Sequence, residues 1–293
     1  MAKLEGAFTA LITPFRNNGA VDEEGLRRNV DFQIEKGIDG VVPCGTTGES
    51  ATLSHEEHKR VIEIVVDQVN GRVPVIAGTG SNSTAEAIDL TKHAFDVGAD
   101  YCLLVCPYYN KPTQKGLLAH FRTLASEVDG GLILYNIPSR TGRNMEPQTV
   151  IELAELDNIV GIKEASGSME QIMRIIREAG EKITVLSGDD MMTFPILALG
   201  GKGVISVASN IVPDLIHQMV FSFLDGRIEE SRQIHYRLMD FFKHLFLETN
   251  PGPVKEAMNI LGMPAGPLRL PMVSCEEKTA EILRDDLKEL GLL

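Results

Sequence analysis

Lys163 ends the apolar run IVGIK, and this position makes it the most informative residue of the sequence. Removal from water lowers the pKa of a lysine, and the neutral amine is a nucleophile toward carbonyl carbon. Schiff-base formation is the usual use of such a lysine. The alternative is a structural lysine that reaches solvent or pairs with the adjacent Glu164. Position alone leaves both interpretations open.

Hydroxyl groups stand at the ends of neighbouring apolar runs. Tyr135 is the last residue but one of LILYN, whereas Thr46, Thr47 and Tyr109 follow the runs GVVPC and YCLLVC. Tyr135 could pass protons to and from a substrate held on Lys163, because a positioned phenol can act as a general acid or base. Taken alone, Tyr135 is better explained as an aromatic residue with a hydrogen-bonded hydroxyl. The other hydroxyls nearby favour a proton relay.

Two further motifs are typical of anion recognition. The segment GTTG at 45–48 would let backbone N–H groups and hydroxyls converge on a carboxylate. A tight turn before a helix explains the same spacing slightly better. Arg140 in PSRTG has the planar fork that binds a carboxylate, although most loop arginines are only solvated. Nucleotide binding is a weak alternative, because no lysine follows GTTG.

A second polar cluster draws on two expected helix starts and one loop, and its members are His55, His58, Asn82, Glu86 and Tyr108. Together these residues could line a polar pocket. Taken singly, the two histidines of HEEHK are better explained as part of a solvated helix face.

Such side chains need a scaffold that brings several strand ends together. Apolar runs alternate with stretches of helical periodicity, and most runs are apolar throughout, as buried parallel strands are. The runs begin near Ala7, Gly40, Val73, Tyr101, Leu132, Ile159, Ile183 and Gly203. A serine followed three residues later by Glu or Gln predicts helix N-termini at Ser54, Ser83, Ser168 and Ser274. The pattern predicts an α/β fold, a (βα)8 TIM barrel, with a doubly wound sheet as the alternative.

No further strand-like run follows residue 213, and helical spacing dominates the rest of the chain. We therefore predict a catalytic barrel over residues 1–225 and a C-terminal helical region over 226–293. No linker rich in Gly, Ser or Pro separates the two parts, so the helical extension should pack on the barrel.

Charge and composition exclude several classes of function. The chain has 28 basic and 41 acidic residues, a net charge of −13, and this field repels nucleic acid and anionic lipid. Its four cysteines lack disulfide or zinc spacing, which favours reduced thiols in the cytoplasm. The apolar run within residues 1–15 is broken by Thr13 and Pro14 and is too short for the hydrophobic region of a signal peptide or for a membrane span. Acidic pairs such as Asp189 and Asp190 lack the spacing of a metal cage, so no metal is expected.

The motifs GTTGES, PYYNKP, LYNIPSRTG and GIKEASG, in this order, resemble the dihydrodipicolinate synthase family of pyruvate-dependent class I aldolases. The similarity covers essentially the whole chain, from ALITPF to LRLPM. It implies a lyase that condenses pyruvate with L-aspartate 4-semialdehyde through a lysine Schiff base. The product would be 4-hydroxy-tetrahydrodipicolinate, in the diaminopimelate route to lysine, and no external cofactor would be required.

The resemblance also implies residue roles. Lys163 would form the Schiff base, and Tyr135, Thr47 and Tyr109 would relay protons, with Tyr109 contributed across a subunit interface of a homotetramer, a dimer of dimers. Substrate contacts would come from Thr46, Thr47, Arg140, Gly188 and Ile205. L-lysine would bind as a feedback inhibitor at a site formed by Ser50, Ala51, His55, His58, Asn82, Glu86 and Tyr108.

Two alternatives stay open beside this hypothesis. A sister lyase, such as N-acetylneuraminate lyase, would share Lys163, Tyr135 and the anion-binding segment. Arg140 and Thr46 argue for the synthase, because sugar-acid lyases usually have a smaller or neutral residue at the first position and often serine at the second. A catalytically silent barrel that senses a small acid is the other alternative, and the intact pair of Lys163 and Tyr135 argues against it.

Overall fold

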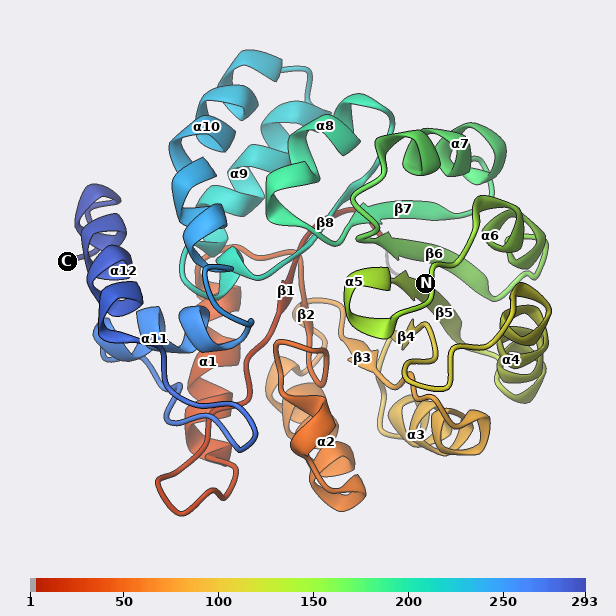
Figure 1. Ribbon diagram of the computed structural model, residues 1–293, viewed down its shortest axis with the longest axis horizontal. Coiled ribbons are helices and arrows are strands. Elements are labelled where there is room, and N and C mark those ends of the chain that lie inside the picture. Colours follow the sequence, from red (N-terminus) through yellow and green to blue (C-terminus); the bar gives the residue numbers. More distant parts are fainter. Residues whose placement is uncertain (1–3) are drawn as a thin grey trace.

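Parallel strands form a nearly closed ring at the centre of the computed structural model, which describes residues 4–293 (Figure 1). Strands neighbouring in sequence pair with each other, β8 pairs with β1, and a bridge between Val41 and Val75 joins β2 to β3. The strands are β1 (Gly6–Ala10), β2 (Gly40–Val42), β3 (Ile76–Gly78), β4 (Tyr101–Val105), β5 (Gly131–Asn136), β6 (Ile159–Glu164), β7 (Thr184–Ser187) and β8 (Gly203–Ser206). The predicted TIM barrel is confirmed, and the doubly wound sheet is wrong.

Helices surround the ring, as Figure 1 shows. They are α1 (Glu23–Glu35), α2 (His55–Val69), α3 (Thr84–Asp96), α4 (Gln114–Glu127), α5 (Pro138–Thr141), α6 (Pro147–Leu153), α7 (Met169–Ala179), α8 (Thr193–Ala198) and α9 (Pro213–Leu224). The short α8 lies in the segment MMTFPILAL at 191–199, between β7 and β8. Within residues 4–293, no helix has the length and apolar character of a membrane span.

The C-terminal region adds α10 (Ile228–His244), α11 (Gly252–Ile260) and α12 (Glu277–Glu289). Helix α10 packs against α9, and α12 packs against both α10 and α11. The division of the chain at residue 225 stays a prediction, and the first three positions of the predicted 1–225 unit lie outside the described residues.

Serine caps begin three of the four helices for which they were predicted. Ser54 forms a reciprocal capping box with Glu57, while Ser83 and Ser168 each accept a backbone N–H three residues later. The prediction at Ser274 is wrong, because α12 begins at Glu277 with Glu276 as its N-cap residue. The backbone N–H of Glu276 instead donates to Glu248 Oε1 at 3.0 Å, a tertiary contact that sequence spacing does not reveal.

Two apolar layers explain why the strand runs are apolar throughout. Phe8, Tyr135 and Ile205 point into the interior of the ring, whereas Leu134 and Val204, their neighbours in sequence, pack against the surrounding helices. Both faces of each strand are therefore buried. A polar side chain at an inward position, such as Lys163, must lie in this apolar interior or at its open end.

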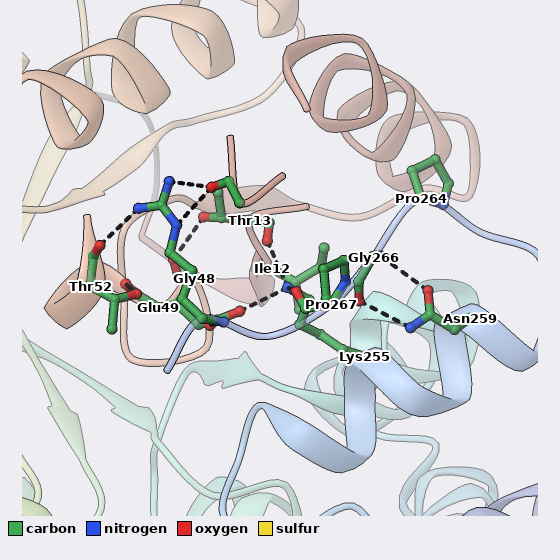
Figure 2. A network of polar contacts seen from close by, with 12 residues as sticks. Ile12, Thr13, Gly48, Glu49, Thr52, Lys255, Asn259, Pro264, Gly266 and Pro267 are labelled. Atoms are coloured by element: carbon green, nitrogen blue, oxygen red, sulfur yellow. Dashed lines mark hydrogen bonds and ion pairs between the residues drawn. The ribbon is translucent and has the colours of Figure 1, made fainter. Parts of the chain in front are cut away.

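A buried ion pair joins the loop after β2 to the C-terminal region. Lys255 of α11 places Nζ 2.8 Å from Oε1 of Glu49, and both side chains are almost fully buried. The same ammonium donates to the backbone oxygens of Thr13 at 3.1 Å and Pro267 at 2.7 Å (Figure 2). All three ammonium protons therefore have acceptors, which offsets the desolvation that lowers the pKa of Lys255.

Arg269 extends this network across the same loop. Its backbone N–H donates to Glu49 Oε2 at 3.1 Å. Its guanidinium donates to the backbone oxygens of Gly19 and Thr52 and to the carboxylate of Glu57. The segment after α11 is thus fastened to both the loop that carries GTTGES and the start of α2.

We predict that Lys255→Met lowers the free energy of unfolding by about 3–5 kcal/mol, because Glu49 then stays buried without its partner. Urea denaturation measures the change. Lys92→Ala, which breaks the exposed pair with Glu127, is the control and should cost about 0–1 kcal/mol. Equal losses of unfolding free energy in Lys255→Met and Lys92→Ala would contradict the prediction. Adding Glu49→Gln to Lys255→Met should recover part of the lost stability, because it removes the unpaired buried charge.

Candidate active site

Lys163 lies at the carboxyl end of β6 with only 6% of its surface exposed. Strand register places it directly beside Tyr135 of β5, and its Nζ lies 4.3 Å from the centroid of the tyrosine ring. Burial lowers the pKa of Lys163 to about 8, with the negative charge of Asp190 opposing the change and the positive charge of Arg140 adding to it. Near neutral pH, the neutral, nucleophilic amine is therefore much more populated than in an exposed lysine.

The alternative that Lys163 pairs with Glu164 is wrong. Successive residues of a strand point to opposite faces, so Glu164 faces the helix layer. Its carboxylate is fully buried there and accepts hydrogen bonds from Asn136 Nδ2 at 3.3 Å, Ser166 N at 2.7 Å and Gln171 Nε2 at 3.2 Å. Strand alternation separates the two side chains that sequence places next to each other.

Asp190 is a residue of the site that the sequence analysis missed. The side chain is 2% exposed, and its Oδ2 accepts the backbone N–H groups of Val207 at 3.0 Å and Ala208 at 3.1 Å. Burial raises the pKa of Asp190 to about 6, and its negative charge opposes the lowering of the Lys163 pKa. Nothing in the sequence indicates this role. Asp190 acts as a single carboxylate, and sequence patterns detect carboxylates only as catalytic pairs or as metal ligands at characteristic spacings.

Tyr135 is buried, and burial raises its pKa to about 12. Its hydroxyl is hydrogen-bonded to Thr46, and this bond and the charge of Arg140 oppose the rise. The hydroxyl beside Tyr135 is therefore that of Thr46, one of the three expected from the residues, whereas the resemblance implied Thr47 for the relay.

Thr47 and Tyr109 lie elsewhere. Thr47 is 3% exposed, and its Oγ1 accepts a hydrogen bond from Asn250 Nδ2 at 3.0 Å. Tyr109 is 90% exposed with a left-handed φ of 69°. Within residues 4–293 no hydrogen bond joins Tyr109 to Thr47 or Tyr135. A single chain therefore brings Lys163, Tyr135 and Thr46 together and leaves Tyr109 at the surface.

A cavity of about 600 Å³ opens at the ends of β5, β6 and β7. It is bounded by Arg140, Ala165, Gly188 and Asp189 from the barrel and by residues 246–250 from the segment after α10. Gly188 is packed against the nucleophile, since a Cβ there would lie 3.0 Å from Lys163 Cε. Ile205 belongs to β8 and is 1% exposed inside the ring, and its contact with substrate stays a prediction.

The segment Phe246–Asn250 is the second part of the site that the sequence analysis did not find. Asn250 Nδ2 contacts Thr47, and its backbone oxygen accepts a hydrogen bond from Arg140 Nη2 at 3.1 Å. This segment continues directly into α11. Its nearness to the barrel mouth depends on how α10 and α11 pack.

Six of the seven residues that the resemblance implies for L-lysine binding line one cavity of about 360 Å³: Ser50, Ala51, His55, His58, Glu86 and Tyr108. Asn82 lies beside it and donates to the backbone oxygen of Tyr108 at 3.2 Å. The cavity is also lined by Thr46, Ile137 and Arg140, and the last two also line the 600 Å³ cavity. The two spaces thus share a wall.

The solvated helix face expected for HEEHK is wrong for His58 and holds for His55. His58 is 7% exposed, and its Nε2 bonds the backbone oxygen of Gly78 at 2.7 Å. A carbonyl oxygen only accepts, so Nε2 carries the proton and Nδ1 is left as an acceptor. Burial lowers the pKa of His58, which favours this neutral form. Glu86 Oε2 accepts from Ser81 Oγ at 2.8 Å.

Fold and site together have the geometry that covalent catalysis through a lysine requires: a desolvated amine, a hydroxyl beside it and a cavity at the barrel mouth. Comparison with known proteins identifies the protein family. A profile described as the Dihydrodipicolinate synthetase family matches residues 3–290, and the chain belongs to that family.

Individual relatives match over nearly their full length. The 4-hydroxy-tetrahydrodipicolinate synthase of Methanothrix thermoacetophila is 55% identical over 287 residues, 98% of this chain and 97% of the relative. The structure of the chloride-inhibited dihydrodipicolinate synthase from Acinetobacter baumannii complexed with pyruvate matches with a TM-score of 0.97 and 42% identity, covering 99% of this chain and 100% of that one. The structure of DHDPS from Cyanidioschyzon merolae with lysine bound has a TM-score of 0.96 and 46% identity, covering 99% of both chains.

The environment of Lys163 predicts how its reactivity depends on pH. The rate of its reductive methylation should rise with pH through an inflection near pH 8 and level off at higher pH, because the neutral amine is the reactive form. Free Nα-acetyl-lysine, with a pKa of about 10.4, should keep rising. Mass spectrometry of the Lys163 peptide measures the rate. Asp190→Asn should shift the inflection to lower pH, and an inflection above pH 10 in the unmodified chain would contradict the assignment.

Proposed function

We propose that the chain is a lyase that condenses pyruvate with L-aspartate 4-semialdehyde to give 4-hydroxy-tetrahydrodipicolinate, in the diaminopimelate route to lysine. The observation that carries the proposal is the buried Lys163, whose Nζ lies 4.3 Å from the Tyr135 ring centroid at the mouth of the barrel. The names of the relatives and the pyruvate complex of one of them support the same reaction.

The first step joins Lys163 to pyruvate. The neutral amine attacks the ketone carbon, and the C–N bond forms as the carbonyl oxygen takes up a proton. Tyr135 supplies that proton and helps expel the oxygen as water, leaving an imine. A phenol with a pKa near 12 holds its proton firmly, so Tyr135 is available as a general acid at neutral pH.

Hydroxyl groups and the backbone of the GTTG segment hold the carboxylate of pyruvate. Thr46, hydrogen-bonded to Tyr135, connects that phenol to the segment, and Thr47 supplies a second hydroxyl. The proton relay thus runs through Thr46 in place of Thr47. Tyr109 completes it from a second copy of the chain in a homotetramer, a dimer of dimers. An aromatic side chain that is 90% exposed and held at a left-handed φ fits such a contact.

The second step forms the carbon–carbon bond. Loss of a proton from the methyl group of the imine gives an enamine, whose carbon attacks the aldehyde carbon of the semialdehyde. The aldehyde C=O double bond opens as its oxygen takes up a proton and becomes the hydroxyl group of the product. Arg140 at the wall of the 600 Å³ cavity binds the carboxylate of this substrate. The substrate amine then attacks the imine carbon, closes the ring and releases Lys163. The protonated imine is the electron sink, so this route requires no cofactor.

Trapping with borohydride tests the proposal. Incubation with pyruvate and borohydride should attach one reduced pyruvate unit to the peptide that carries Lys163, because borohydride reduces the imine to a stable amine. Peptide mass spectrometry locates the adduct, and borohydride without pyruvate is the control. An adduct on another lysine, or turnover with no trapped adduct, would exclude the proposed chemistry.

The 360 Å³ cavity is the proposed feedback site for L-lysine, formed by Ser50, Ala51, His55, His58, Asn82, Glu86 and Tyr108. A free amino acid needs an anion for its ammonium groups and donors for its carboxylate, and the cavity offers Glu86 for the first. The lysine-bound structure of one relative supports this assignment. Ile137 and Arg140 line this cavity and the catalytic one, so a bound amino acid can act on the active site without occupying it.

Millimolar L-lysine should inhibit the intact oligomer without simple competition against pyruvate. Glu86→Ala should abolish this inhibition while leaving the uninhibited rate largely intact, because only the ammonium partner is lost. Steady-state assays with varied pyruvate and lysine measure both. Glu127→Ala, an exposed glutamate on α4, is the matched control and should keep full inhibition. Activity that saturating lysine leaves unchanged would refute the proposed feedback site.

We also propose that the enzyme acts in the cytoplasm, together with the other enzymes of the diaminopimelate route. Burial of Cys44, Cys102 and Cys106 as free thiols is consistent with a reducing compartment.

A further inference from the structure

Asn250 stands between the two groups that would hold the substrate carboxylates. Its side-chain Nδ2 donates to Thr47 Oγ1 at 3.0 Å, and its backbone oxygen accepts from Arg140 Nη2 at 3.1 Å. One residue from outside the eight strands therefore contacts both the loop after β2 and the loop after β5. Asn250 also borders the 600 Å³ cavity.

A purely structural role does not explain the Asn250 side chain. Asn250 is 4% exposed, and its Oδ1 is buried without a hydrogen-bond partner within residues 4–293. A buried amide that satisfies only its donor end costs stability compared with an apolar residue of the same shape. The explanation must come from the end of the amide that is used, which is the Nδ2 group that donates to Thr47.

The direction of the hydrogen bond decides what Thr47 can do. A threonine hydroxyl has one proton to donate, and its oxygen accepts from others. Because Asn250 Nδ2 donates to Thr47 Oγ1, the threonine proton is not used in this contact and is free to be donated elsewhere. A carboxylate accepts hydrogen bonds only, so it needs donors in this orientation.

We infer that Asn250 is a positioning residue that turns Thr47 into a hydrogen-bond donor for the carboxylate of pyruvate. This inference rests on the proposed function. The position of Asn250 itself is fixed by the C-terminal region, because α11, which begins two residues later, carries the Lys255 that is anchored on Glu49. The C-terminal region thereby contributes to substrate binding and not only to packing.

The test is the dependence of pyruvate trapping on pyruvate concentration. Asn250→Ala should raise the half-saturating pyruvate concentration by about 10- to 100-fold, the effect of losing one hydrogen bond to a charged group. The limiting trapping rate should change little, because Lys163 and Tyr135 are untouched. In a Thr47→Ala background, the further substitution of Asn250 should add nothing, since Asn250 acts through Thr47.

Asn250→Asp keeps the shape and reverses the hydrogen bond. The introduced carboxylate accepts from Thr47 and repels pyruvate, so half-saturation should be worse than in Asn250→Ala at neutral pH. Burial raises the pKa of a carboxyl group, and the neutral acid can donate again. The defect relative to the unmodified chain should therefore shrink as pH falls, whereas that of Asn250→Ala should not. A purely structural role would not produce this difference.

Asn259→Ala controls for loosening of the C-terminal region, because Asn259 bonds both backbone groups of Gly266 away from the cavity (Figure 2). Its half-saturation should match that of the unmodified chain. Normal half-saturation in Asn250→Ala, or effects of Asn250 and Thr47 that multiply, would overturn the inference alone. No adduct on Lys163 of the unmodified chain would overturn the proposed function, and the inference with it.

Discussion

Desolvation of one amine is the constraint around which this structure is arranged. Lys163 lies at an inward position of β6, where the apolar interior of the barrel surrounds its stem and disfavours its charge. The protein limits this effect with Asp190, whose carboxylate is fixed by two backbone N–H groups of the loop after β8. The balance leaves a pKa of about 8. Burial without Asp190 would lower the pKa of Lys163 further. If Glu164 faced the same side of the strand, its carboxylate would oppose this lowering more strongly.

The C-terminal helices are tied to the barrel mouth by charge and by backbone carbonyls. Lys255 and Arg269 both contact Glu49, a residue held in the left-handed region at φ 54° directly after GTTG. A non-glycine residue in that conformation is strained, and the two cationic residues supply the contacts that hold it there. The loop that binds the substrate carboxylate in the proposed function therefore depends on residues more than 200 positions away in the chain.

The two cavities share Ile137 and Arg140, and this shared wall gives the feedback hypothesis a physical basis. Arg140 is also bonded to the backbone of Asn250, so a displacement at the wall would reach the C-terminal side of the active site. The coupling needs no contact between effector and substrate. It needs only that both ligands favour different positions of the same short helix, α5.

The sequence by itself determined the barrel and the residues at its mouth. Strand runs that are apolar on both faces, separated by helical stretches, leave few ways to bury the sheet. Tyr135 and then Lys163 lie at the carboxyl ends of two consecutive strands. Tertiary structure alone decided what surrounds them. The orientation of Glu164 away from Lys163 follows from strand alternation, but Asp190, Asn250 and the burial of His58 depend on loops and helices whose packing sequence spacing does not encode. Sequence spacing also does not decide which of the two adjacent threonines bonds Tyr135. The backbone of the loop after β2 turns Thr46 toward the phenol and Thr47 toward Asn250. That backbone is held by contacts from the far end of the chain.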